Sequence, residues 1–322
     1  MEFLHINPLL IVTFEAMIEQ ISDEVTFDRA LILCSDFQSF HIYLRHYAND
    51  PDVEICGFVY CVKGKPVPCD LVGEEERIPV FGLPDMQRAI IELHITKCFV
   101  HLHNIPMPQV QAVVNRVVAT GKCKVQFLSP YVFGCKSFKP AIAITSIAPQ
   151  VGKSQLARYI CEVLAKKGKK VAIILPMSEI PNVRVIEPDQ GIHLYCRNVD
   201  DPIIDELPEE TATLCKGYMR SGAYRVYITT NTRKAIITAE QHSDVILYDA
   251  EGCGHAFILS QPGHPVTNFC VVTKNSISGV RDVSLWPGVV NALLSNSIAV
   301  FTPENAPLTD LDKTKLKDVL SH

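Results

Sequence analysis

This 322-residue chain lacks the features that mark three large classes of protein. No stretch reaches the ~20 unbroken apolar residues that a membrane-spanning helix requires. None of the twelve cysteines forms a CxxC pair, the spacing typical of zinc ribbons and thiol oxidoreductases. Lys and Arg number 30 against 35 Asp and Glu, and no basic stripe gathers them. Neither a membrane nor nucleic acid is therefore expected as a partner.

The cysteines predict buried thiols rather than disulfides. Most lie in or beside apolar runs, as Cys34 does in ALILC, Cys98 in KCFV and Cys270 in NFCVV. Free thiols of this kind are typical of a reducing compartment. The chain starts with an acidic Glu2 and without the basic segment of a secretory signal. We therefore expect a soluble, cytoplasmic protein.

Length and composition indicate two globular domains. Hydrophobic residues make up 48% of the chain and charged residues 20%, a composition that supports well-packed cores. We divide the chain into a leader (1–28), a Rossmann-like domain (29–138) and a P-loop NTPase-like domain (139–322). The boundary lies within the linker Lys136-Ser137-Phe138-Lys139-Pro140, where the proline interrupts regular structure.

Strand-like and helix-like segments alternate in the first domain. The apolar runs ALILC (30–34), VEICGFVYC (53–61) and KCFVHLH (97–103) predict buried strands. Helical periodicity over 107–121 predicts a helix, which is followed by a further strand, CKVQFLSP (123–130). Such alternation is typical of an α/β fold with a parallel sheet. The glycine-rich dinucleotide fingerprint is missing after the first strand, where the chain reads Ser35-Asp36-Phe37-Gln38-Ser39-Phe40. NAD is therefore not the expected ligand.

The second domain opens with a pattern that predicts phosphate binding. A buried strand, AIAITS (141–146), is followed by IAPQVGKS and then by a predicted helix over 153–167. Backbone N–H groups at a helix N-terminus hold phosphate oxygens, Lys153 is expected to reach the β- and γ-phosphates, and the Ser154 hydroxyl to bind Mg²⁺. The candidate nucleotide-binding residues are Gln150, Val151, Gly152, Lys153, Ser154 and Gln155.

An acidic residue at the end of a later strand is the candidate partner of this loop. Asp249 closes the apolar run VILYD, the arrangement of a Walker B carboxylate that orients Mg²⁺. Glu251 follows two residues later and is a candidate base. Lys153, Asp249 and Glu251 are thus the candidate catalytic residues, with Ser154 and Asp249 on the metal.

These pieces together resemble the cyclic 2,3-diphosphoglycerate synthetase family of P-loop NTPases, in a divergent and shortened form. The likeness extends over most of 29–303 and includes the linker, the Gly152-Lys153-Ser154-Gln155 turn, Pro176-Met177, the VILYD strand, and Trp286-Pro287-Gly288 with Asn291. The resemblance implies a Rossmann-like domain fused to a P-loop domain. It also implies ATP-driven phosphoryl transfer to a small anionic metabolite.

The departures from the family pattern concern the phosphate and base sites. Where the family has a glycine this chain has Gln150, and where it has an Arg-Thr pair the chain has Ala148-Pro149. The base-reading Asn-Lys-x-Asp segment is replaced by Phe301-Thr302-Pro303-Glu304. A lost Arg removes positive charge from a phosphate site, and a lost base reader removes the purine pocket.

Three functions therefore stay open. The first is an ATP- or GTP-dependent phosphotransferase or ligase that uses Mg²⁺ and acts on a small phosphorylated metabolite. The second is a catalytically degenerate P-loop protein with a regulatory, assembly or partner-binding role, as a homo-oligomer or with another protein. The third is a small-molecule-binding module in the first domain. His101 and His103, which alternate at a strand end, are interpreted as core or loop histidines because no third metal ligand accompanies them.

Overall fold

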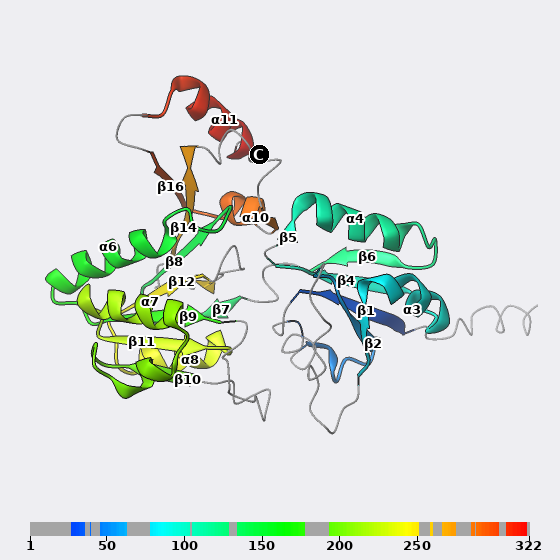
Figure 1. The fold of residues 1–322 in the computed structure, drawn as a ribbon, viewed down its shortest axis with the longest axis horizontal. Coiled ribbons are helices and arrows are strands. Elements are labelled where there is room, and N and C mark those ends of the chain that lie inside the picture. The colour runs from blue at the N-terminus through cyan, green and yellow to red at the C-terminus, as the bar shows by residue number, and fades with distance from the viewer. Residues whose placement is uncertain are drawn as a thin grey trace, which may run out of the picture.

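The structure of the chain is a computed structural model. It describes residues 27–35, 39, 46–62, 78–103, 105–128, 134–177, 193–250, 258–259, 266–274, 285–286, 288–302 and 307–320. Two sheets, one of five strands and one of seven, carry helices on their faces (Figure 1). The predicted α/β class with parallel sheets is confirmed.

The five-stranded sheet is parallel throughout and has the strand order β3-β2-β1-β4-β6. In chain order its strands are 1 to 5, so the sheet reads 3-2-1-4-5, as the first five strands of a Rossmann fold do. Its strands are β1 (Asp28–Cys34), β2 (Val53–Tyr60), β3 (Val80–Gly82), β4 (Lys97–His101) and β6 (Lys124–Phe127).

Helices α3 (Met86–Glu92) and α4 (Met107–Val118) cover one face of this sheet. A short 3-10 helix, η2 (Leu83–Asp85), leads into α3. Alternate residues of β1 point to the two faces: Leu31 and Leu33 pack under the helices, whereas Ile32 packs on the opposite side. Because both faces are covered, the strand reads as one apolar run, which is why it is visible in the sequence.

The seven-stranded sheet has the order β10-β11-β9-β12-β8-β14-β16 and is parallel except for the edge strand β10. In sequence order its strands are β8 (Ala141–Ser146), β9 (Val171–Pro176), β10 (His193–Cys196), β11 (Arg225–Thr229), β12 (Val245–Asp249), β14 (Val266–Thr273) and β16 (Ser297–Phe301). The four strands that follow β8 in the chain (β9 to β12) all lie on one side of it, and β14 and β16 lie on the other side. The carboxyl end of β8 is therefore a switch point, where parallel α/β sheets bind ligands.

Helices α6 (Lys153–Lys166) and α7 (Glu209–Arg220) pack on one face of the seven-stranded sheet, and α8 (Thr232–Glu240) packs on the other. A 3-10 helix, η3 (Pro202–Glu206), precedes α7. Near the β14–β16 edge, α10 (Gly288–Leu293) and α11 (Asp310–Leu320) complete the described helices. Figure 1 shows α11 at the top, beyond β16.

Two short strand pairs connect distant parts of the chain. β7 (Cys135–Lys136) pairs in parallel with β13 (Ile258–Leu259). β15 (Leu285–Trp286) pairs antiparallel with β5 (Ile105–Pro106), and the Trp286 ring lies 5.1 Å from that of Phe127. Trp286 thus packs against the core of the five-stranded sheet although it follows β14 in the sequence.

Several segments differ from the sequence-based prediction. The strand expected over 97–103 ends at His101, and the polar tail after Pro303, for which no structure was predicted, contains α11. Strand β10 was not predicted from the sequence, and it is antiparallel to β11 in an otherwise parallel sheet. The leader (1–28) lies outside the described residues up to residue 26. Within the described ranges, no helix is both long and apolar enough to cross a membrane.

Candidate functional site

The loop between β8 and α6 has a glycine at the point where the helix starts. Gly152 is the N-cap of α6 and has a φ of 96°, in the left-handed region that L side chains rarely adopt. A β-carbon at this position would lie 3.3 Å from the ring of Phe301, at the end of β16. The backbone conformation therefore favours glycine here, and any larger side chain would also crowd the Phe301 ring.

Gln150 shares this left-handed conformation, with a φ of 58°. Its side chain is exposed, so packing does not explain the residue. A left-handed conformation costs a non-glycine residue about 1–2 kcal/mol. The loop therefore has, at Gln150, a backbone conformation suited to glycine.

The first turn of α6 supplies the cation and the hydroxyl that the motif predicts. Lys153 is the first residue of the helix and is 8% exposed. A lysine is rarely buried to this extent without a charged partner, and the carboxylate of Asp249 exerts the opposite charge on this site. Ser154, the next residue, donates a hydrogen bond from its Oγ to Oδ2 of Asp249 over 2.7 Å.

Asp249 ends β12, which lies next to β8 in parallel register. These two strands, which the sequence indicates as buried strands on either side of the site, therefore lie in one sheet with their carboxyl ends at the same edge. The carboxyl group is 5% exposed, and burial raises its pKa above the ordinary value. Hydrogen bonds from Tyr218 and Ser154 and the positive charges of Lys153 and Arg158 oppose this rise.

Within the described residues, one oxygen of the Asp249 carboxylate accepts both hydrogen bonds made to that side chain. Oδ2 accepts from Ser154 and, over 2.6 Å, from the hydroxyl of Tyr218. Oδ1 is buried and has no hydrogen-bond partner among the residues that the structure describes. A buried carboxylate oxygen without a donor is costly unless a cation or a further donor binds it.

This arrangement fits a magnesium–nucleotide complex better than an ion held by protein alone. Across the described part of the chain, no group of three or more His, Cys, Asp or Glu is placed to hold a metal ion. Mg²⁺ is usually held by one or two side chains together with substrate phosphates and water. The Asp249 carboxylate and the Ser154 hydroxyl, hydrogen-bonded to each other, supply such a pair.

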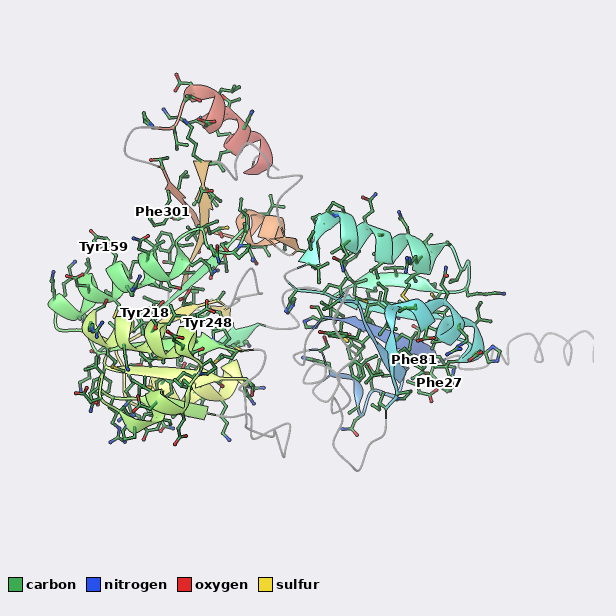
Figure 2. All side chains as sticks on the ribbon, in the orientation of Figure 1. Phe27, Phe81, Tyr159, Tyr218, Tyr248 and Phe301 are labelled. Carbon is green, nitrogen blue, oxygen red and sulfur yellow. The ribbon has the colours of Figure 1, made fainter. Side chains whose placement is uncertain are left out.

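Two residues that no motif indicated complete the site. Tyr218 reaches Asp249 from α7, and Arg158, one turn after Ser154, donates from Nε to the Ser154 carbonyl over 3.2 Å. Figure 2 shows Tyr218 in the half of the molecule that holds the seven-stranded sheet, with Phe301 towards the β16 edge. The only sequence feature of Tyr218 is its place at a buried position of a helix, which does not indicate a functional role.

A second glycine permits a close contact with the loop between β8 and α6. Gly288 begins α10, and a β-carbon there would lie 2.5 Å from the carbonyl oxygen of Ile147. From the same helix, Asn291 donates from Nδ2 to the Ser146 carbonyl over 3.5 Å. The Trp286–Asn291 segment therefore packs against the end of β8 at one end and against the five-stranded sheet at the other.

The remaining candidates lie elsewhere or outside the described residues. Glu251, the candidate base, is outside them. His101 and His103 are buried at the end of β4, with ring centroids 4.2 Å apart. Ser39 Oγ lies 2.6 Å from Nδ1 of His101. This matches the expectation of core histidines.

The described cysteines are all free thiols, most of them buried, as predicted. Two pairs lie in contact. Cys98 and Cys123 have their sulfur atoms 3.7 Å apart, and a hydrogen bond links Cys196 with Cys215.

Comparison with known proteins finds a distant relative of this chain. Over 297 residues the chain is 24% identical to arginine synthetase ArcE of Thermococcus kodakarensis. The match covers 89% of this chain but 62% of that protein, so the chain spans less than two thirds of its relative. No protein-family model matches the chain.

Two solved structures show weaker likeness. The precorrin-6A reductase CobK is 10% identical, with 74% of this chain and 91% of that chain covered and a TM-score of 0.26. A DUF1611 family protein from Anabaena variabilis is 11% identical, with 92% and 99% covered and a TM-score of 0.24.

Proposed function

We propose that this protein binds a purine nucleotide with Mg²⁺ at the loop 147–154. The observation that carries the proposal is the hydrogen bond between Ser154 and Asp249, two residues that the motifs select independently. Helix α6 would direct its N-terminal N–H groups at the phosphates. Lys153 would add a positive charge, and Ser154 and Asp249 would hold the metal. When bound, Mg²⁺ would neutralise phosphate charge.

The reaction class that we propose is phosphoryl transfer to a small anionic metabolite, with ATP or GTP as the donor. The similarity to a protein named arginine synthetase supports a synthetase-like activity. Arginine and its precursors are therefore to be tested as substrates beside phosphorylated metabolites. We also propose that the chain divides between 138 and 139 into the two domains, each built on one of the sheets.

A second candidate is nucleotide binding without turnover. It is favoured by Gln150, whose left-handed backbone stands where the family pattern has glycine, and by Phe301, whose ring lies against Gly152. By the family resemblance, Phe301 also begins the segment that replaces the base-reading residues. Such a protein would act through a conformational or assembly response to the nucleotide.

Binding is tested by calorimetric titration and thermal shift with ATP, GTP and ADP, each with Mg²⁺ and with EDTA. We expect stabilisation of about 2.7 kcal/mol at a nucleotide concentration 100 times the Kd. Lys153→Ala should abolish the shift without unfolding the protein. Lys166→Ala is the matched control, because it removes a lysine from the exposed end of the same helix, where its partner is Glu162.

The outcomes separate the candidates. A wild-type protein that shows no shift at millimolar ATP or GTP would refute nucleotide binding at this loop. A shift that Lys153→Ala leaves intact would place the nucleotide elsewhere. Binding without phosphate transfer to any tested metabolite would favour the second candidate.

A further inference from the structure

Helix α7 brings a buried phenol to the carboxylate that ends β12. The Tyr218 hydroxyl donates to Oδ2 of Asp249 over 2.6 Å, and the Tyr218 side chain has no exposed surface. Thirty-one residues separate the two in the sequence. A buried hydroxyl needs a partner, and here the partner is the side chain that the proposed metal site requires.

Ser154 and Tyr218, the two donors to Oδ2, would have different roles in a metal site. Ser154 is itself a proposed ligand, so its hydroxyl oxygen would face the metal. Tyr218 comes from a different helix and is not a proposed metal ligand. Since both bonds end on Oδ2, they fix the carboxylate in one orientation and leave the buried Oδ1 without a partner among the described residues.

Helix α7 contacts α6 next to Tyr218, where the Arg158 side chain of α6 lies against Gly217. A β-carbon at Gly217 would lie 3.0 Å from Nη1 of Arg158 and 3.2 Å from its Cδ. Glycine is disfavoured inside a helix, so its presence next to Tyr218 fits the need for close approach. Arg158 also donates to the Ser154 carbonyl. The guanidinium thereby spans the helix that carries Ser154 and the helix that carries Tyr218.

We propose that Tyr218 is a positioning residue for the metal site: it holds Asp249 so that Oδ1 is presented to Mg²⁺. The inference rests on the proposed function, because it needs the magnesium–nucleotide site. Its own content is narrower. Removing the hydroxyl should weaken metal binding and leave the affinity for the metal-free nucleotide unchanged, since phosphates are held by the loop and Lys153.

The test uses Mn²⁺ as a spectroscopic substitute for Mg²⁺, which prefers the same oxygen ligands. Free and bound Mn²⁺ are measured by electron paramagnetic resonance in the presence of ADP, and ADP binding in EDTA is measured by calorimetry. Tyr218→Phe keeps the ring and removes only the hydroxyl. We expect Mn²⁺ affinity to fall by about 10–100-fold, as for other residues that orient metal ligands.

Tyr248→Phe is the matched control. Tyr248 precedes Asp249 on the same strand and is also buried, but it packs in the cluster on the α8 face. Figure 2 labels both tyrosines. The control should retain wild-type Mn²⁺ affinity. If the two variants lose affinity equally, the effect is one of general packing and the inference is overturned.

A double variant distinguishes positioning from an independent effect. If Tyr218 acts through Asp249, Tyr218→Phe in the Asp249→Asn background should cause no further loss of Mn²⁺ binding. Additive losses would overturn the inference, as would wild-type Mn²⁺ affinity in Tyr218→Phe. Failure of the proposed function looks different, because the wild-type protein itself would then bind neither ADP nor Mn²⁺ with ADP.

Discussion

The hydroxyl of Ser154 lies 2.7 Å from Oδ2 of Asp249, although 95 residues separate them in the sequence. Parallel pairing of β8 with β12 produces this proximity, because the two strands end at the same edge of the sheet. Each residue alone is weak support for a nucleotide site, since helices often start with serine and strands often end with aspartate. Their hydrogen bond makes the combination specific.

The first prediction concerns Gln150, whose φ of 58° is unfavourable for glutamine. Gln150→Gly should relieve about 1–2 kcal/mol of strain, while the greater freedom of the unfolded chain takes back about 0.4–1 kcal/mol. We therefore expect the free energy of unfolding, measured by urea denaturation, to rise by up to about 1.6 kcal/mol. Gln150→Val, whose β-branch tolerates this conformation poorly, should lower it. Equal stability of the two variants would contradict the strain.

The second prediction concerns Gly288, which packs against the backbone of Ile147. An alanine there must displace the start of the 147–154 loop, because its β-carbon would meet backbone atoms of Ile147, which cannot rotate away. We expect nucleotide affinity to fall about tenfold or more, since displacements of about 1 Å at a site have large effects. Calorimetric titration with ADP, below the unfolding temperature, measures the change.

Gly57 provides the control for this experiment. Its β-carbon would lie 2.8 Å from the ring of Phe81 and 2.9 Å from the carbonyl of Pro79, a comparable clash in the five-stranded sheet. Both alanine variants should lose about 1–3 kcal/mol of stability from overpacking. Only Gly288→Ala should lose affinity. A similar loss in Gly57→Ala would mean that affinity simply follows stability.

The sequence was sufficient to predict the parallel strands that frame the site. AIAITS and VILYD coincide with β8 and β12 because strands covered on both faces are apolar without interruption. The turn into α6 was also predictable, since Gly152, Lys153 and Ser154 follow such a strand directly. Their meeting with Asp249 then followed from the rule that parallel strands end at one edge.

Tyr218 and Arg158 could not be predicted as parts of the site. Their contacts depend on how α7 rotates and slides on α6, which periodicity does not determine. Arg158 packs against Gly217 where the two helices meet, but a lone glycine in a helical pattern does not indicate its partner. The antiparallel strand β10 was missed for a related reason: its direction depends on pairing with β11, which lies some thirty residues away.

The third prediction concerns the thiol of Cys123. A hydrogen bond from Cys98 lowers the pKa of Cys123 to about 7, against the opposing effect of burial, and raises the pKa of Cys98. About half of Cys123 should then be thiolate at neutral pH. Its alkylation by iodoacetamide, followed by mass spectrometry, should increase with a midpoint near pH 7.

Two comparisons test the cause of this shift. Cys98→Ala removes the donor and should move the midpoint upward, towards the value of an ordinary thiol. Cys161, whose pKa burial raises to about 11, should stay unmodified at neutral pH in the same sample. A Cys123 midpoint that does not change in Cys98→Ala would show that the thiol pair does not control it.

The last prediction concerns how much phosphoryl transfer survives in this chain. The reaction depends on positioned positive charge, and losing one such contact costs ~10³-fold or more. Lys153 is in place, but the Arg-Thr pair expected from the family resemblance is Ala148-Pro149 here, and Phe301 stands where the base reader would begin. We therefore expect phosphate release well below ~1 s⁻¹, the low end for working enzymes, and little discrimination between ATP and GTP.

Steady-state phosphate release with each nucleotide measures this expectation, and the Asp249→Asn variant gives the background rate. Turnover near ~1 s⁻¹ or faster that is selective for one purine and lost in Asp249→Asn would show that the substitutions in the loop are compensated. Release equal to that of the variant would leave binding, not catalysis, as the role of the site.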